Sequence, residues 1–225
     1  MLMFNYRSFN DAYHGIKHYI KTRYEYEYDG RNGKVYEVIG LSYRVDTVCT
    51  FPLIKHNTSI TREYCRDFYS KLFINAPSDT DIKWFKETYK DNVKTFLDNP
   101  KGLSDGFNTI YGNRISRQLP IVKRELLNEK GSRRAVIKIL SETDNVLLGT
   151  DEVIEYPCID SISLFVRDGK LNVHTHMRSN NMGTVAVLDM YLIGRLQSQL
   201  ANELNLKTGV FSCSIASAHI FEKDL

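Results

Sequence analysis

Cysteine is scarce in this sequence, and its spacing does not suit a metal site or a disulfide scaffold. The four cysteines are widely separated and form no CxxC pair: Cys49, Cys65, Cys158 and Cys213. Zinc ligands usually come in closely spaced pairs, and disulfides belong to oxidising compartments. We therefore expect free thiols, no metal site and a reducing environment.

Long apolar segments are also missing. No run approaches the roughly 20 residues that a membrane-spanning helix needs. The first residues, MLMFNYRSFNDAYHG, lack the basic and apolar blocks of a secretory signal. These absences predict a cytoplasmic protein that does not bind membranes.

Neither sign of charge dominates. The chain carries 30 basic and 27 acidic residues, a net charge of +3, so no broad nucleic-acid-binding surface is indicated. Small basic clusters could still bind one anionic ligand. The length of 225 residues suits a single domain over residues 1–225, and neither repeats nor a linker divide it.

Hydrophobic periodicity predicts an α+β fold. Apolar residues recur at helical spacing over residues 9–24, 60–72, 119–126 and 188–200, and a shorter helix is expected around Trp84. The helix over 119–126 should end near Lys130-Gly131 with the glycine as its C-cap. Strand-like segments are VYEVIGLSY, AVIKIL and VFSCSIASAHIF. Alternating apolar residues on both sides of Asp168-Gly169 predict a β-hairpin.

Cys158, in the segment EYPCIDS, has neighbours that suggest chemistry. A single cysteine is more often a buried, unreactive side chain than a nucleophile. Here, however, several polar groups accompany it along the chain. They are Tyr111-Gly112, Ser132-Arg133-Arg134, Pro157-Cys158, Arg178-Ser179, Asp189 and Ala218-His219-Ile220.

This order of groups resembles the thymidylate synthase superfamily. Its catalytic cysteine follows a proline and precedes a hairpin, an Arg-Ser pair, a polar residue that reads the base and a terminal strand with histidine. The resemblance covers most of the chain from about Arg31 onward. It implies a thymidylate synthase-like fold, a mixed β-sheet packed by helices, with one sheet face forming a homodimer interface.

Within that superfamily the chain most resembles the deoxycytidylate hydroxymethylases of T-even type bacteriophages. The similar segments are VYEVIGLSY, TREYCRDFY and MRSNN, and Ser217 stands where synthases usually have aspartate. This resemblance implies a role in phage DNA modification, with the host cytoplasm as the location.

The resemblance assigns Cys158 as the nucleophile and Arg178 to contacts with the thiolate and the phosphate. C5 of a pyrimidine is a poor nucleophile until a thiolate adds to C6. Without the motif, Arg178 would be read as a surface cation at a strand end. Paired guanidinium groups bind phosphate through charge-assisted hydrogen bonds. The residues assigned to the phosphate are Arg31, Arg133, Arg134 and Ser179.

The arginine pair Arg133 and Arg134 reaches the partner's site across a twofold interface in the related enzymes. An obligate homodimer is therefore implied. The alternative is that both arginines are solvated cations at the start of a strand.

Asp189 stands where the methylating enzymes carry asparagine. Cytosine presents an amino donor at N4 and an acceptor at N3, and a carboxylate accepts from the amino group. Uracil O4 would instead face the carboxylate acceptor to acceptor. Asp189 therefore indicates cytosine, unless it is only a helix cap or a surface residue.

The remaining assignments, apart from that of the two hairpin histidines, also come from the resemblance. Glu63 would manage protons and an ordered water near the base, although spacing from residues 51–53 selects Asp67 instead. His219 and Tyr111 would lie near the sugar and the thiol. Asn181, which replaces an aspartate common in the family, and Trp84 would contact folate. His174 and His176 are expected to be solvent-facing hairpin residues.

The sequence thus predicts a one-carbon transferase of nucleotide biosynthesis. It would convert dCMP, 5,10-methylenetetrahydrofolate and water to 5-hydroxymethyl-dCMP and tetrahydrofolate. One alternative is a thymidylate synthase-like enzyme that acts on dUMP. Another is a catalytically degenerate homologue that binds a nucleotide.

Overall fold

The computed structural model describes residues 2–30, 33–46, 48, 60–89, 103–147 and 156–225, without the side chains of residues 2, 103–110, 146 and 147. The predictions for Arg31 and Cys49 lie outside the described residues. The other cysteines, Cys65, Cys158 and Cys213, are free thiols, as expected.

Within these residues, seven strands form one mixed sheet in the order β1-β3-β7-β6-β5-β4, and β2 pairs with β3. β1 runs parallel to β3 and β6 parallel to β7, while the other pairs are antiparallel. The strands are β1 (Leu2–Tyr6), β2 (Tyr26–Gly30), β3 (Gly33–Val45), β4 (Val136–Lys138), β5 (Ile159–Arg167), β6 (Lys170–Asn181) and β7 (Lys207–Phe221).

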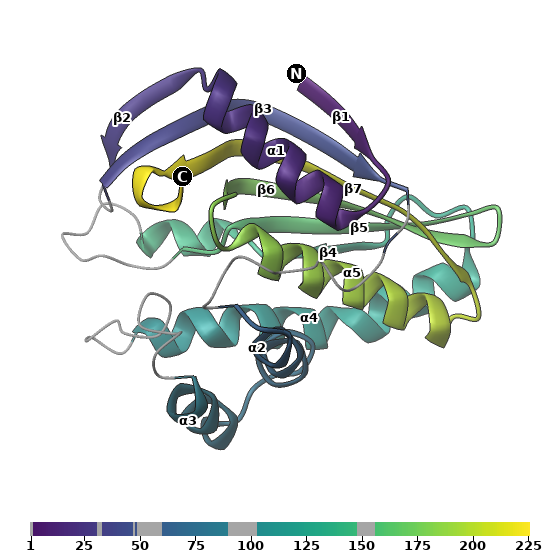
Figure 1. Cartoon of the computed structure of the whole chain (residues 1–225). Helices are drawn as coiled ribbons and strands as arrows, with labels where there is room; N and C mark the ends of the chain where they lie inside the picture. Colours follow the sequence, from purple (N-terminus) through teal and green to yellow (C-terminus); the bar gives the residue numbers. More distant parts are fainter. Residues whose placement is uncertain (1, 31–32, 47, 49–59, 90–102, 148–155) are drawn as a thin grey trace.

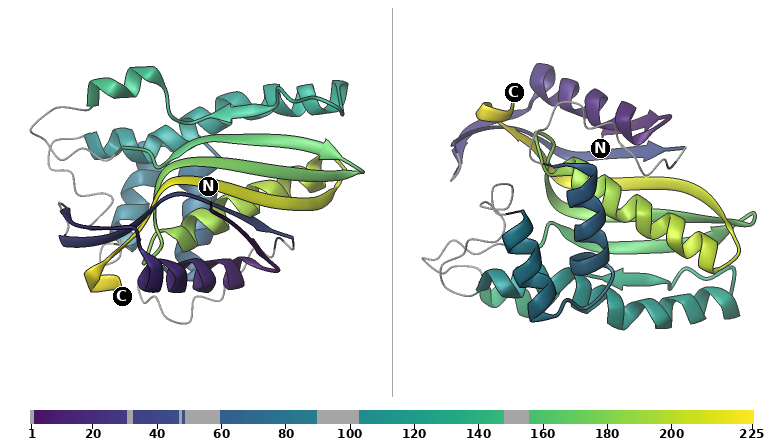
Figure 2. Two further views of the ribbon diagram at one scale, coloured as in Figure 1. Left: turned by 90° about the horizontal axis from the view of Figure 1, so that it is seen from above. Right: turned by 60° about the horizontal axis from the view of Figure 1, so that its bottom comes forward.

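Helices cover one face of this sheet. α1 packs on β3 and β7, and α5 packs beside it on β6 and β7 (Figure 1). α4 lies along β4, and α2, η1 and α3 form an outer group against α4 and α5 (Figure 2). The helices are α1 (Phe9–Arg23), α2 (Arg62–Phe68), the π-helix η1 (Tyr69–Phe73), α3 (Asp79–Thr88), α4 (Leu103–Asn128), α5 (Ala186–Glu203) and the 3₁₀ helices η2 (Glu142–Leu147) and η3 (Glu222–Asp224). The α+β prediction is confirmed.

Local chemistry explains the elements that the sequence predicted. The Ser8 hydroxyl accepts a hydrogen bond from the backbone N–H of Asp11 and caps α1. In the hairpin of β5 and β6, Asp168 and Gly169 have φ values of 51° and 69°. Both turn residues with positive φ match the right-handed twist of the paired strands. The predicted hairpin is confirmed.

Other boundaries differ from the predictions. α4 begins at Leu103 and continues through the exposed Pro120, so it is much longer than predicted. It ends at Asn128, and Gly131 does not have a positive φ, so the predicted glycine cap is wrong. β1 and β2 were not predicted. No described helix combines the length and hydropathy that a membrane span requires.

The other face of the sheet is lined mainly by small and polar side chains. Ser42 and Ser214 share a hydrogen bond of 3.0 Å between their Oγ atoms, and Nδ1 of His174 lies 2.9 Å from Oγ of Ser212. His176 is exposed on this face, whereas His174 is half-buried. The resemblance assigns this face to a partner chain, and that assignment stays a prediction.

A kink in the sheet runs through three neighbouring strands. In β6 the buried positions change from odd to even numbers between Met177 and Asn180, and in β7 they do so between Ile215 and Ala218. β3, which runs antiparallel to β7, changes in chain order from even (Val38) to odd (Leu41) around Gly40, whose φ is 69°. Because all three strands change together, their pairing is kept while the exposed and buried sides exchange.

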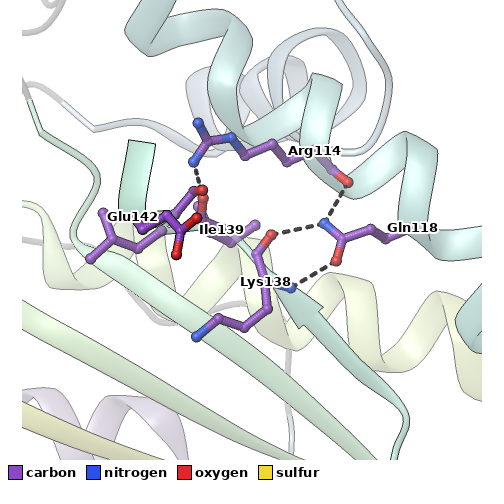
Figure 3. A pocket seen from close by; sticks show the side chains of 7 residues that line it. Arg114, Gln118, Lys138, Ile139 and Glu142 are labelled. Carbon is purple, nitrogen blue, oxygen red and sulfur yellow. Dashed lines mark hydrogen bonds between the residues drawn. The ribbon is translucent and has the colours of Figure 1, made fainter. Parts of the chain in front are cut away.

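The free edge of β4 is capped by one side chain. The Gln118 amide donates to the carbonyl of Lys138 at 2.8 Å and accepts from its backbone N–H at 2.9 Å (Figure 3). Arg114, one turn earlier, forms a bidentate ion pair with Asp144 at 2.6 and 2.7 Å. These contacts join α4 to the edge of the sheet and occupy backbone groups that could pair with another chain.

Gly112 permits the close approach of α4 to η1. A Cβ at this position would lie 2.0 Å from the carbonyl oxygen of Asn75 and 2.9 Å from that of Leu72. We expect Gly112→Ala to lower the free energy of unfolding by about 3 kcal/mol or more, because backbone atoms must move to admit the methyl group. Urea denaturation measures this change.

Gly131→Ala is the matched control. Its Cβ would meet only the carboxylate at the end of the Glu129 side chain, at 3.0 Å, and no backbone atom. A change within about 1 kcal/mol is expected. Equal losses in the two variants would contradict the packing argument.

Candidate active site

Cys158 lies half-buried immediately before β5. Its backbone N–H donates to the hydroxyl oxygen of Tyr111 at 3.2 Å, which joins the cysteine to α4. Its Sγ lies 3.9 Å from Nη2 of Arg178 on β6. The thiol therefore has a guanidinium beside it, an arrangement that favours the thiolate form of a cysteine.

Arg178 is fixed in place rather than solvated. Its Nε donates to the carbonyl of Pro157 at 2.9 Å, and its Nη2 donates to that of Tyr156 at 2.6 Å. The guanidinium also lies over the Tyr156 ring, 5.1 Å from the centroid. The surface-cation alternative does not fit these contacts.

Asp189 is a buried carboxyl group at the start of α5. It is 7% exposed, and its Oδ2 accepts a hydrogen bond of 3.2 Å from Nδ2 of Asn180. Burial raises the pKa of Asp189 to about 7. Val185, not Asp189, is the N-cap residue of α5, so the helix-cap and surface alternatives for Asp189 are wrong.

Three groups on other elements lie within electrostatic reach of this carboxyl. Burial raises the pKa values of Tyr111 on α4 and Tyr43 on β3, and the negative charge of Asp189 adds to both effects. The pKa of Cys213 on β7 is raised by the same two causes. All three groups therefore stay protonated near neutral pH. The charge of Cys158 also raises the pKa of Tyr111, so Tyr111 lies within electrostatic reach of both the thiol and the carboxyl.

His219 and Ser179 lie on adjacent parallel strands near this cluster. Ser179 Oγ is 3.4 Å from Nδ1 of His219. Burial lowers the pKa of His219, so the imidazole is neutral near pH 7. The guanidinium of Arg178 also lowers that pKa, which places His219 within electrostatic reach of the arginine beside the thiol.

The site is assembled from segments that are distant in sequence. Tyr111 comes from α4, Cys158 from the residue before β5, Arg178 and Ser179 from β6, Asp189 from α5 and His219 from β7. Parallel pairing of β6 with β7 places Ser179 opposite Ser217 and Asn181 opposite His219. A thiol, a guanidinium, an imidazole and a titratable carboxyl are thus brought together around the kink in the sheet. This arrangement suits covalent catalysis on a polar heterocycle.

A sequence model of the family described as Thymidylate synthase matches residues 11–225. The chain belongs to the thymidylate synthase family. A protein named "Putative thymidylate synthase" in Methanosarcina barkeri is 25% identical over 184 residues, which are 75% of this chain and 81% of the relative. A protein of the same name in Methanopyrus kandleri is 29% identical over 126 residues, 53% of this chain and 58% of the relative. The thymidylate synthase of Bacillus licheniformis is 23% identical over 117 residues, 52% of this chain and 40% of the relative.

Thymidylate synthase-family enzymes transfer one-carbon units and use methylenetetrahydrofolate as co-substrate. The predicted family and fold are therefore confirmed. The residue roles taken from the resemblance remain predictions.

Both acidic candidates lie on α2. Glu63 is exposed in the first turn of the helix. The side chain of Asp67 is 17% exposed and accepts hydrogen bonds from the Tyr89 hydroxyl at 2.7 Å and from Nε of Arg66 at 3.0 Å. Neither acid is brought into contact with the cluster around Cys158 in the described part of the chain. The choice between them stays open.

The predicted phosphate pair lies away from the thiol of its own chain. Arg133 and Arg134 are exposed between α4 and β4, and Arg134 donates to a carboxylate oxygen of Glu125 at 2.9 and 3.0 Å. This position is compatible with the prediction that the pair serves a second copy.

The predicted folate residues lie on separate elements. Trp84, on α3, is 38% exposed and has the Lys71 ammonium 4.7 Å above its ring. Asn181 donates to Thr184 Oγ1 at 2.9 Å and accepts from the backbone N–H of Gly183 at 2.8 Å.

Asn180 is the residue that the sequence reasoning missed. It is 3% exposed and contacts Asp189 directly. Simple alternation from Met177 directs position 180 to the open face of the sheet, but the kink turns it inward. The only signal was its place beside Arg178-Ser179 in the phrase MRSNN.

The raised pKa of Asp189 predicts a pH-dependent stability. Because the folded pKa of about 7 exceeds the ordinary 3.8, this group favours the folded state fully below pH about 4 and loses that contribution as pH rises through 7. Replacement by Asn removes the titration. Relative to the wild type, Asp189→Asn should gain stability from pH 4 to pH 8, by about 4 kcal/mol at most. Urea denaturation across this range measures the difference, and a constant difference would contradict the buried titrating carboxyl.

Proposed function

We propose that the protein is a deoxycytidylate 5-hydroxymethyltransferase, which converts dCMP, 5,10-methylenetetrahydrofolate and water to 5-hydroxymethyl-dCMP and tetrahydrofolate. The observation that carries this proposal is the buried carboxyl group of Asp189 in the cluster that contains Cys158. Family membership supports the one-carbon transfer, and Asp189 supports the choice of base.

The edge of cytosine matches the hydrogen-bonding capacity of Asp189. Its N4 amino group donates and its N3 accepts. A carboxyl group with a pKa of about 7 is partly ionised at neutral pH, and its ionised form can accept from N4. Leaving a buried donor or acceptor unpaired is costly, so this position can discriminate strongly between bases.

The proposed reaction begins at Cys158. The thiolate forms an Sγ–C6 bond, which makes C5 nucleophilic. C5 takes the one-carbon unit that methylenetetrahydrofolate supplies and loses its proton, and tetrahydrofolate leaves. A hydroxide from water then adds to the resulting exocyclic methylene as the Sγ–C6 bond breaks. No oxidant or reductant is required, whereas methylation would require a hydride.

Arg178 would both stabilise the thiolate and bind the phosphate. Its backbone-held guanidinium stays near Sγ, at 3.9 Å, without a change of rotamer. Ser179 and the neutral His219 would complete the nucleotide contacts, with Tyr111 near the reacting sulfur. Glu63, or Asp67, would activate the water.

A homodimer is part of this proposal. Arg133 and Arg134 of a second copy would supply the remaining charge for a phosphate that carries nearly two negative charges. The polar sheet face that carries Ser42, His174 and Ser214 would be the interface. The exposed position of the arginine pair supports this arrangement.

Folate would meet a neutral side chain at position 181. Both polar ends of the Asn181 amide are occupied by Thr184 and Gly183, so the side chain is held rigidly and carries no charge. Trp84 offers a partly exposed aromatic face. These groups suit stacking and neutral hydrogen bonding of a heterocycle.

Action on dUMP is the second candidate. The relatives are named as thymidylate synthases, and the protonated form of Asp189 could donate to O4 of uracil. The hydrogen bond to uracil requires protonated Asp189, so binding of dUMP should weaken above pH 7. The hydrogen bond from the cytosine amino group to ionised Asp189 should persist above that pH.

The substrate assignment predicts the product and its dependence on Asp189. With methylenetetrahydrofolate, the wild type should form 5-hydroxymethyl-dCMP from dCMP and prefer dCMP to dUMP in kcat/KM. Asp189→Asn should lower the dCMP:dUMP ratio by about 100-fold or more, because the amide reverses the donor and acceptor pattern. Mass spectrometry of the nucleotide products measures both.

Asp168→Asn is the matched control, since Asp168 lies exposed in the β5-β6 turn and Asn tolerates its positive φ. Its ratio should equal that of the wild type. Preferential formation of dTMP from dUMP by the wild type would overturn the substrate assignment.

A further inference from the structure

Beside the base-reading carboxyl lies a buried amide that the proposed reaction does not use. We infer that Asn180 is a positioning residue for Asp189: it binds Oδ2 of the carboxyl group and thereby leaves Oδ1 to meet the ligand. The inference rests on the proposed function only for the identity of that ligand.

The amide nitrogen of Asn180 has two hydrogen-bond partners. Nδ2 lies 3.2 Å from Oδ2 of Asp189 and 3.1 Å from Sδ of Met177, three residues earlier on the same strand. The rigid β6 backbone carries both Asn180 and Met177. The donor to Asp189 is therefore fixed by a strand and a packed side chain, not by a loop.

The carbonyl end of the same amide has no partner. Oδ1 of Asn180 is buried and accepts no hydrogen bond in the described part of the chain. An unsatisfied buried acceptor costs stability. Leucine or methionine could fill this apolar space without that cost. The amide is thus better explained by its action on Asp189 than by packing.

The surroundings of Asp189 make Asn180 its main electrostatic support. Tyr111 on α4, Tyr43 on β3 and Cys213 on β7 lie within electrostatic reach of the carboxyl, and all are neutral near pH 7. Burial raises the pKa of Asp189, and the hydrogen bond from Asn180 opposes that rise. Asn180 thus favours the ionised carboxyl, which accepts from an amino group.

Because Asn180 occupies Oδ2 of Asp189, only Oδ1 of that carboxyl is open to a ligand. Within the described residues, Oδ1 of Asp189 receives no hydrogen bond, and it is not among the fully buried unpaired atoms. A ligand would therefore meet one open acceptor held at a fixed angle. This suits a donor such as an exocyclic amino group more than an acceptor such as a carbonyl oxygen.

The test observes Asp189 without any substrate. The protein is labelled with ¹³C at its aspartate carboxyl groups and titrated by NMR, and Asp189→Asn identifies the signal. Asn180→Leu keeps a similar volume but removes the amide. It should shift the Asp189 pKa upward by about one unit. An unchanged pKa would overturn the inference.

Asn172→Leu is the matched control. Asn172 lies on the same strand, but its Oδ1 accepts from the backbone N–H of Val210 and its role is structural. This variant should lose stability without moving the Asp189 pKa, and a shift equal to that of Asn180→Leu would overturn the specific role. If Asn180→Leu does not fold, Asn180→Ala, which also lacks the amide, should give the same upward shift, and its absence would overturn the inference.

Kinetics separate this inference from the proposed function. If dCMP is the substrate, Asn180→Leu should move the acid limb of kcat/KM to higher pH, and it should have no further effect on base preference in the Asp189→Asn background. A shifted NMR pKa with no turnover of dCMP would support the role of Asn180 while rejecting the substrate. Turnover of dCMP with an unshifted Asp189 pKa would support the substrate and reject the role of Asn180.

Discussion

The burial of one carboxyl group, that of Asp189, constrains this site more than any other feature. A carboxyl group in bulk water would be ionised at neutral pH, and water would compete with a base for its hydrogen bonds. Inside the protein, Asp189 titrates near pH 7 and has one oxygen already bound by Asn180. Burial of an incompletely hydrogen-bonded group costs free energy, and a ligand with a complementary edge would recover part of that cost. Under the proposed function, the burial therefore connects the stability of the fold to the choice of base.

The kink in the sheet makes that burial possible. β3, β6 and β7 change the side that faces the core at one level, so Asn180 points inward while Arg178 and Ser179 lie at the bend. A regular β6 would direct Asn180 to the polar sheet face and leave Asp189 without its donor. The helices complete the site, since α4 brings Tyr111 to the backbone of Cys158 and α5 carries Asp189.

Much of the fold was predictable from local patterns. The hairpin at Asp168-Gly169 and the Ser8-capped helix follow from turn and cap chemistry that depends on a few neighbouring residues. The order of Cys158, Arg178, Asp189 and His219 indicated the family. β2 was not predicted because its segment YEYDG is largely exposed and forms a strand only through pairing with β3. The role of Asn180 was not predictable either, because the kink depends on three strands at once and local alternation points the wrong way.

The central claim is that the sulfur of Cys158 bonds to a cytosine ring that Asp189 selects. The most direct measurement uses 5-fluoro-dCMP with methylenetetrahydrofolate, because fluorine cannot leave C5 as a cation and the covalent adduct should accumulate. Mass spectrometry of the digested protein should find nucleotide and folate attached to the peptide that contains Cys158, and more adduct from 5-fluoro-dCMP than from 5-fluoro-dUMP. Attachment to another residue, or a preference for 5-fluoro-dUMP, would contradict the account.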